Sequence, residues 1–356
     1  MAELEQLTVA TRRFIRSNPT LIDMIFQNDP LWAYLRANVP EEYDGGRYIG
    51  EPFVYDGLVG GAYRKGKQFD ITQKQVEQEL QFDPKYFQVN ITMFKEDIQV
   101  INKGGNAIFK LIESRTQNAY MTMGAHQAIA QYLNGSNAGY EANFCGLAEA
   151  LNDGSTASWD GNTYTTYGTI TRGGTVGSAL NSVPVNVAGI IEYPTLEENF
   201  SAACFGSIEP NLGITTSLGF SYIRERFQTQ QRFSNVTDAN IGFRGLEFQG
   251  ATLMKSRYAP GTAISAASDP IAVGFLEESS GGVVTAYPTM TSETLFWLNA
   301  RKPYANLYVS TDPEYAYGFT GFKPSQGNTE IAGQVLYAGA LTFAPRYHKQ
   351  MYGITG

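Results

Sequence analysis

The segment GAYRKGKQ, residues 61–68, has the spacing most suggestive of chemistry in this sequence. Gly61 and Gly66 are separated by four residues and are followed by Lys67, which matches most of the phosphate-binding loop G-x-x-x-x-G-K-[ST]. The backbone N–H groups of such a loop hold phosphates, and its lysine reaches the β and γ oxygens. Gln68 stands where Ser or Thr would bind Mg²⁺, and the sequence predicts no apolar strand before the loop and no helix after it. A nucleotide hydrolase is therefore kept only as an alternative function.

Other residue types with catalytic potential lack the spacing that chemistry requires. Adjacent acidic pairs such as Glu41-Glu42 cannot face each other across a cleft, as the carboxylates of a glycosidase must. The stretch GGTVGSA at 173–179 follows a predicted loop, and no G-x-S-x-G nucleophile motif occurs. The cysteines and histidines are too widely spaced for a disulfide framework or a zinc site: Cys145, Cys204, His126 and His348. The sequence thus predicts no catalytic, cofactor-binding or metal-binding residue, and no enzyme.

Composition narrows the class of protein. The 356 residues are 43% hydrophobic and 17% charged, which is typical of a folded chain with a sizeable core. The formal net charge of −8 argues against a nucleic-acid reader held by a basic surface. No apolar run is long enough to span a membrane, and the first residues, MAELEQLTVATRRF, lack the basic start of a signal peptide. We therefore expect a chain that is intracellular when made.

The elements that carry residues 61–68 are unusual for a folded domain. Residues 45–73 are rich in aromatic and β-branched residues but interrupted by glycines, which predicts an extended ribbon. The next segment, PKYFQVNITMF, alternates apolar and polar residues and predicts a strand with one buried face. Ribbon and strand form an excursion over 46–93. Because an isolated two-stranded ribbon is marginally stable in water, this excursion needs a packing partner.

The tip of the ribbon carries a basic cluster. Arg64, Lys65 and Lys67 are interleaved with the aromatic residues Tyr63 and Phe69. Such a cluster can contact nucleic acid, or it can complement an acidic neighbouring protein surface, and we favour the second interpretation.

Helical patterns flank the excursion. Leu21, Ile22, Ile25 and Phe26 have helical spacing, and Asp29-Pro30 predicts the N-cap and first position of a second short helix. Downstream, NAIFKLIESRTQNAYMTMGAHQAIAQYLNG contains no proline and predicts a helix over about 106–134 that ends at Asn134-Gly135. At 1.5 Å per residue this helix is a rod of roughly 42 Å.

The second half of the chain mixes strands and helices. Residues 152–185 are rich in Gly, Ser and Thr and predict loops and small hairpins. TLEENFSAACFG predicts a helix with Thr195 and Glu198 as its capping box. NLGITTSLGFSYIRERFQTQQRF predicts a strand leading into a helix, GLEFQGATLMKSRYAPGT a strand, and SETLFWLNARKPYANLYV a strand pair. The final run, EIAGQVLYAGALTFAPRYHKQMYG, predicts a long strand stopped by Pro345.

Several long segments in this order resemble the major capsid proteins of tailed bacteriophages over nearly the whole chain. The segments are YFQVNITMFKEDIQVINKGGNAIFKLIESRTQNAYMTMG, EPNLGITTSLGFSYIRERFQTQQRF with IGFRGLEFQGATLMKSRYAPGT, LFWLNARKPYANLYV, and GQVLYAGALTFAPRYHKQMYGI. The resemblance implies an α+β fold with a long spine helix, at about 106–134. Its implied parts are an N-terminal arm (1–45), an extended β-hairpin loop (46–93), a peripheral domain with the spine helix (94–185), an axial domain with insertions (186–330) and a C-terminal return strand of the peripheral domain (331–356).

The resemblance also implies a function and a contact surface. The chain would be a structural subunit that self-assembles as hexamers and pentamers into an icosahedral head around double-stranded DNA. The extended loop would lie over the peripheral domain of an adjacent subunit. The residues implied to make this inter-subunit contact are Phe53, Val54, Tyr55, Leu58, Val59, Tyr63, Arg64, Lys65 and Lys67.

Further partners and an alternative follow from the same resemblance. It implies a separate scaffolding protein, a portal, in some cases a decoration protein, and DNA held without sequence-specific contacts. Assembly would take place in the cytoplasm of a host bacterium, the product would be a virion capsid, and no membrane is involved. An encapsulin-like nanocompartment shell, which encloses cargo enzymes, is the alternative with the same fold.

Overall fold

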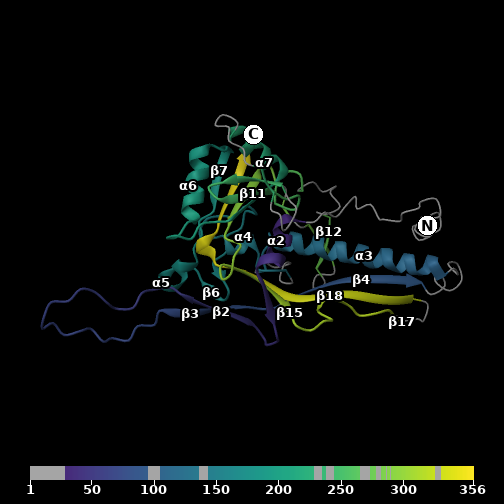
Figure 1. The fold of residues 1–356 in the computed structure, drawn as a ribbon, viewed down its shortest axis with the longest axis horizontal. Coiled ribbons are helices and arrows are strands. Elements are labelled where there is room, and N and C mark those ends of the chain that lie inside the picture. Colours follow the sequence, from purple (N-terminus) through teal and green to yellow (C-terminus); the bar gives the residue numbers. More distant parts are fainter. Residues whose placement is uncertain are drawn as a thin grey trace.

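The computed structural model describes residues 29–94, 105–135, 143–227, 235–237, 244–264, 273–277, 282–285, 287–288, 290–324 and 330–356. The helix predicted around 21–26 lies outside the described residues. The described part of the chain is a mixed α+β structure built on two sheets, with a hairpin that protrudes to one side (Figure 1).

The first sheet is organised around one long strand. The described chain gives it six strands, in the order β1 (Pro40–Tyr43), β15 (Ala305–Ser310), β18 (Glu330–Phe343) and β16 (Ala316–Phe319), with β4 (Lys85–Phe94) and β17 (Lys323–Pro324) also paired to β18. β18 runs antiparallel to β4 from Glu330↔Phe94 to Gly339↔Lys85. The helix α3 (Gly105–Ala130) packs against β4 and β18 and runs alongside them (Figure 1).

The second sheet has seven strands in the described part of the chain. Its order is β7 (Val185–Ile190), β19 (Lys349–Thr355), β14 (Glu293–Leu298), β8 (Leu212–Thr215), β11 (Ala251–Lys255), β10 (Arg244–Phe248) and β9 (Asn235–Thr237). The helices α6 (Tyr193–Ala203) and α7 (Ser217–Phe227) pack on it. Every residue of β14 is buried, as expected for a central strand covered on both faces.

Short elements complete the described structure. They are the helices α2 (Pro30–Asn38), α4 (Leu147–Ala150) and α5 (Gly174–Gly177), the 3-10 turns η3 (Ser178–Leu180) and η5 (Pro345–Tyr347), and the two-stranded pairs β2 (Ile49–Val54) with β3 (Glu77–Phe82), β5 (Thr166–Tyr167) with β6 (Ile170–Thr171), and β12 (Val273–Glu277) with β13 (Gly282–Thr285). Two apolar cores hold these elements together. The larger core joins α2, α3 and the first sheet to one face of the second sheet, where it includes Ile214 of β8 and Phe296 of β14. The smaller core lies between the second sheet and the helices α6 and α7.

The buried carboxylate of Asp29 connects the start of the described chain to residues that follow α3 and β11. Asp29 is the predicted N-cap of α2, with Pro30 in the first turn, and its Oδ2 accepts a hydrogen bond from the Trp32 N–H at 2.9 Å. The same carboxylate accepts from Gln131 Nε2, just after α3, and from Ser256 Oγ, just after β11. Burial raises the pKa of Asp29 to about 6 against the effect of these hydrogen bonds.

Several predicted elements are confirmed with changed boundaries. α3 has 26 residues and ends at Ala130, so Asn134-Gly135 does not close the helix as predicted. The segment predicted as a strand at 245–262 instead contains most of the hairpin β10–β11, because Gln249 and Gly250 both have positive φ, +46° and +84°, as a two-residue hairpin turn requires. The strand leading into a helix that is predicted at 211–233 is confirmed, over its described residues, as β8 and α7.

The capping box predicted for α6 is wrong. The helix begins at Tyr193 with Glu192 as its N-cap, and no side chain caps it. Pro194 fits the first turn of a helix, where its missing N–H costs no hydrogen bond, so the helix starts upstream of Thr195. Thr195 therefore lies inside the first turn rather than before it.

Two predicted strand runs prove to cross between the sheets. The strand pair predicted at 292–309 is β14 and β15, which pair with different neighbours in different sheets. The return strand predicted over 331–356 is two strands, because η5 at Pro345 separates β18 in the first sheet from β19 in the second. The excursion predicted over 46–93 is also divided. Its strand β4 belongs to the first sheet, whereas β2 and β3 pair only with each other. The domain boundaries themselves stay predictions.

Candidate functional site

The base of the β2–β3 hairpin is fixed to the first sheet by one carboxylate. Glu51 Oε1 accepts hydrogen bonds from Asn306 Nδ2 at 2.9 Å, from the Tyr308 hydroxyl at 3.0 Å and from Thr342 Oγ1. The donors come from β15 and β18, and the β15↔β18 register places Asn306 opposite Thr342. An ionised carboxylate is the strongest acceptor that the chain can offer such donors. The hairpin base is thus held on a sheet that is distant in sequence.

Apolar packing holds the other side of the base. Ile49, Leu80 and Phe82 are buried, and the Phe82 ring lies edge-on to Tyr167 with a centroid separation of 5.2 Å. The Gln81 N–H donates to the Gly168 carbonyl at 3.0 Å. A Cβ at Gly168 would lie 2.9 Å from Leu80, and its φ is +53°, so a glycine is needed for this close approach. The hairpin therefore leaves the body of the protein from a rigid base.

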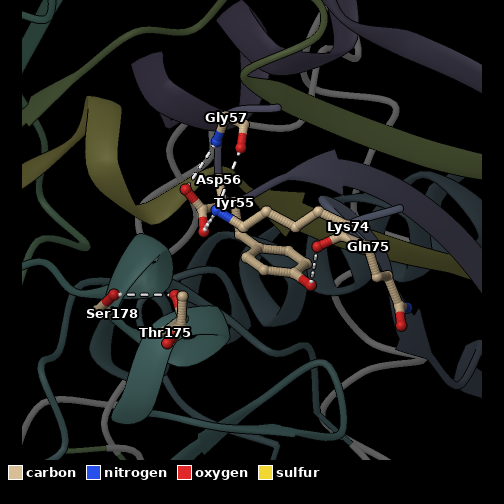
Figure 2. A network of polar contacts seen from close by, with 7 residues as sticks. All are labelled: Tyr55, Asp56, Gly57, Lys74, Gln75, Thr175 and Ser178. Atoms are coloured by element: carbon tan, nitrogen blue, oxygen red, sulfur yellow. Dashed lines mark hydrogen bonds and ion pairs between the residues drawn. The ribbon is translucent and has the colours of Figure 1, made fainter. Parts of the chain in front are cut away.

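Polar contacts join the two arms of the hairpin just beyond the ends of β2 and β3. Lys74 Nζ pairs with Asp56 Oδ2 at 2.6 Å and donates to the Gly57 carbonyl at 3.2 Å. The Tyr55 hydroxyl donates to the Gln75 carbonyl at 2.8 Å (Figure 2). The hydrogen bond from Lys74 is the main reason that the pKa of Asp56 lies below its usual value. These contacts keep the two arms of the hairpin side by side up to Gly57 and Lys74.

Beyond them, residues 58–73, here called the hairpin tip, have no regular secondary structure and are exposed along their whole length. Large apolar side chains face solvent there, with Leu58 at 74% and Ile71 at 93% exposure. Tyr63 and Phe69 touch only edge to face, with ring centroids 4.9 Å apart, and both are exposed. Five large apolar or aromatic side chains are exposed within these 16 residues: Leu58, Val59, Tyr63, Phe69 and Ile71. The hairpin tip therefore has the character of a docking element.

The basic cluster forms an exposed turn at the hairpin tip. The Lys67 N–H donates to the Arg64 carbonyl at 3.0 Å, and Gly66 takes the positive φ, +87°, that the turn requires. Among the residues that the structure describes, Arg64, Lys65 and Lys67 have no ion-pair partner. No helix follows Lys67, so its backbone offers no helix N-terminus to a phosphate. The nucleotide hydrolase alternative thus has no structural support.

The nine predicted contact residues divide into two groups. Phe53 is half-buried against the larger core of its own chain, and the Tyr55 hydroxyl is bound to Gln75, so both serve the base of the hairpin. The others are exposed: Val54, Leu58, Val59, Tyr63, Arg64, Lys65 and Lys67. Their contact with another subunit stays a prediction.

Two residues important to this surface were not predicted. Ile71 is the most exposed large apolar side chain on the hairpin tip. The sequence pattern that could have identified it is the alternation of apolar and polar residues around Asp70 and Thr72. Glu51 could not have been found from the sequence, because its three donors lie more than 250 residues away.

Other kinds of site find little support in the described part of the chain. They contain no group of three or more His, Cys, Asp and Glu side chains placed to hold a metal ion. His348 is fully buried and neutral, with its pKa lowered to about 4 by burial. Among the described helices, none has the length and apolar character needed to cross a membrane.

Comparison with known proteins identifies the fold by shape rather than by sequence. No protein-family model and no curated protein matches the chain at the level of sequence. The capsid subunit of cyanophage A-1(L) is 12% identical, with 96% of this chain and 98% of that chain covered and a TM-score of 0.63.

Two further structures show the same similarity. The holo-SrpI encapsulin complex of Synechococcus elongatus PCC 7942 is 9% identical over 97% of this chain and 94% of that chain, with a TM-score of 0.57. The head of Helicobacter pylori bacteriophage KHP40 is 8% identical over 95% and 93% of the two chains, with a TM-score of 0.52. The chain therefore has the α+β fold of tailed-phage major capsid proteins, which the encapsulin shares.

Proposed function

We propose that this protein is the structural subunit of an icosahedral phage head and self-assembles as hexamers and pentamers around double-stranded DNA. The observation that carries the proposal is the hairpin. Its base is fixed by Glu51 and by buried apolar residues, whereas its tip presents exposed apolar and basic side chains. A rigid base with an unpartnered tip suits a segment that packs on another subunit.

The fold and the charge of the chain support the same proposal. The structural similarity covers nearly the whole chain and joins it to capsid subunits. The net charge of −8 suits a container, because a strongly basic wall would bind the phosphates of the enclosed DNA. In this role the subunit works without catalytic turnover. A separate scaffolding protein, a portal and, in some heads, a decoration protein would be its partners, with assembly in the host cytoplasm.

An encapsulin-like shell is the second candidate, since the SrpI encapsulin complex shares the fold. The two candidates differ in what the shell encloses, which is DNA in one case and protein cargo in the other. The contents of particles purified from the native source therefore discriminate between them.

The direct test is assembly of the purified chain, alone and with its candidate scaffolding protein. We expect closed particles of megadalton mass by light scattering and negative-stain electron microscopy. A monodisperse 39.1 kDa monomer under both conditions would contradict the proposal.

A further inference from the structure

A polar cluster lies within the larger apolar core, where α2 lies beside the end of α3 (Figure 1). At its centre is the Asp29 carboxylate, which is 4% exposed. Its Oδ2 accepts hydrogen bonds from the Trp32 N–H in α2 and from Gln131 Nε2 just after α3. Its Oδ1 accepts from Ser256 Oγ just after β11, and this hydroxyl accepts from the Tyr258 N–H at 3.0 Å. One carboxylate therefore joins α2 to two segments that are distant in sequence.

In the described part of the chain, no cation forms an ion pair with this carboxylate. The charged side chain of α2, Arg36, lies over the Tyr317 ring instead, with 4.7 Å between the guanidinium carbon and the ring centroid. Arg257 adjoins Ser256 in the sequence, but it is not among the groups that shift the pKa of Asp29. Burial raises this pKa to about 6, and the neutral hydrogen-bond donors only partly oppose the effect. The ionised form of Asp29 thus places an unbalanced charge in the core, which is unfavourable.

Two tyrosines face the same carboxylate. Tyr132 and Tyr287 both interact with the charge of Asp29, and both are fully buried. The Tyr287 hydroxyl donates to the Tyr258 carbonyl at 2.7 Å. Burial raises the pKa of both phenols well above its usual value, so both stay neutral in mild acid and at neutral pH. Among the described groups of this cluster, Asp29 is therefore the one that changes its charge at mildly acidic pH.

The Gln131 amide can serve either protonation state of Asp29. Its Nε2 donates to the ionised carboxylate, and its Oε1 is buried and bonded to no other described group. A protonated carboxyl group is itself a donor. Rotation of the amide by half a turn would let Oε1 accept from the Asp29 O–H, while Ser256 continues to donate to the other carboxyl oxygen. The cluster therefore stays hydrogen-bonded in both states, and the charge of the ionised state is what distinguishes them.

We propose that Asp29 is a proton-operated latch, which holds α2 against the ends of α3 and β11 when its carboxyl group is protonated and loosens α2 when that group is ionised. The inference goes beyond the proposed function, because it concerns the body of a single subunit and no contact between copies. α2 has nine residues, fewer than an isolated helix needs to be stable in water, so it stays helical only while it is docked. The latch acts where residues 1–28 join the body of the chain.

The direction of the pH dependence follows from the two environments of the carboxyl group. In the docked state burial raises its pKa from 3.8 to about 6, whereas in an open state the group is in water and its pKa returns to the usual value. The docked state therefore binds more protons between these values, so docking is strongest at low pH and weakens as the pH rises through about 6. A shift of about two pKa units corresponds to a change of roughly a hundredfold in the docking equilibrium.

Hydrogen exchange of unassembled full-length subunits tests the latch. Between pH 4.5 and pH 7, after correction for intrinsic exchange rates, we expect the protection of the α2 amides to fall about tenfold or more, while the buried strand β14 stays protected. The variant D29N keeps an N-cap residue and cannot ionise, so its α2 protection is expected to stay constant over this range.

The matched control is D83N, which removes an exposed carboxylate between β3 and β4. We expect its α2 protection to depend on pH as that of the wild type does. An equal fall in α2 and β14, or the same fall in D29N as in the wild type, would overturn the latch.

Infrared difference spectroscopy reports the protonation itself, because a protonated carboxyl group has a C=O stretching band apart from the bands of ionised carboxylates. In the difference between wild type and D29N we expect this band at pH 4.5 and its loss as the pH rises through about 6. Ser256→Ala removes a donor that favours the ionised form, so both the band loss and the loosening of α2 should move to higher pH. A carboxyl group already ionised at pH 4.5, or band loss without loosening of α2, would overturn this inference and leave the proposed shell intact.

Discussion

At the scale of single residues, Glu51 decides whether the hairpin has a rigid base. Its oxygen serves three donors on β15 and β18. We predict that Glu51→Ala lowers the free energy of unfolding by about 1–3 kcal/mol, because the donors lose a charged acceptor. Hydrogen exchange should then accelerate in β2 and β3. Glu77→Ala on the same hairpin is the matched control, since Glu77 is exposed, and faster exchange in both variants would contradict the anchor role.

Two buried titratable residues act on stability in opposite directions. The His348 Nδ1 accepts from the Asn299 N–H at 3.0 Å and its Nε2–H donates to the Tyr304 carbonyl at 3.0 Å, which holds the ring neutral. Its pKa is lowered from 6.5 to about 4, so the unfolded chain binds more protons between these values and stability falls as the pH drops through this range. Asp29, with its pKa raised from 3.8 to about 6, instead loses stability as the pH rises from about 4 to 6.

These opposite slopes predict how two variants will differ. Each group contributes on the order of 3 kcal/mol across its window, since one pKa unit corresponds to about 1.4 kcal/mol. Urea unfolding from pH 4 to 6.5 should show that His348→Asn removes a rise in stability with pH, whereas Asp29→Asn makes the rise steeper. Parallel curves for wild type and both variants would show that neither group titrates as its burial implies.

At the scale of elements, the hairpin divides into a part that folds with the body and a part that does not. The Lys74–Asp56 ion pair marks the boundary (Figure 2). We predict that replacing residues 58–73 by Asn-Gly, which favours a two-residue hairpin turn, leaves a soluble chain whose unfolding free energy changes by less than about 0.5 kcal/mol. Particle formation should be lost. Unfolding of this variant, or its normal assembly, would show that the hairpin tip packs within its own chain or is dispensable.

The other decisive elements are the segments that change sheets. β14 continues into β15, and β18 continues through η5 into β19, so the chain passes twice between the two sheets within its last 64 residues, from Glu293 to Gly356. His348 lies at the second crossing and binds backbone atoms beside the first. The two sheets are therefore joined by covalent crossings and by a shared buried ring, which couples them mechanically.

At the scale of the whole molecule, the free subunit and the assembled subunit should differ mainly at the hairpin tip. Most backbone N–H groups of residues 58–73 have no acceptor in the described part of the chain. We predict rapid hydrogen exchange over 58–73 in free subunits and strong protection in particles, with little change in β14, which is already buried. Equal exchange of the hairpin tip in both states would contradict its role in assembly.

The sequence by itself determined the local features that depend on near neighbours. Asp29-Pro30 predicted the start of α2, the proline-free stretch predicted α3, and the alternation of Phe87, Val89, Ile91 and Met93 predicted β4. The exposed apolar and basic residues of the hairpin tip were also recognisable, because a ribbon with such side chains cannot bury them locally. The order of these elements along the chain was enough to predict the fold.

Only the tertiary structure decided which distant elements meet. That β14 and β15 separate into different sheets, and that the last 26 residues form two strands in two sheets, depends on packing partners and not on local pattern. The Glu51 anchor and the contact between the rings of Tyr86 and Tyr315 likewise join residues more than 200 positions apart, through strand register. Local propensity acts over a few residues, whereas register and burial are set by the whole chain, so the surface that a partner would meet is readable only in the folded molecule.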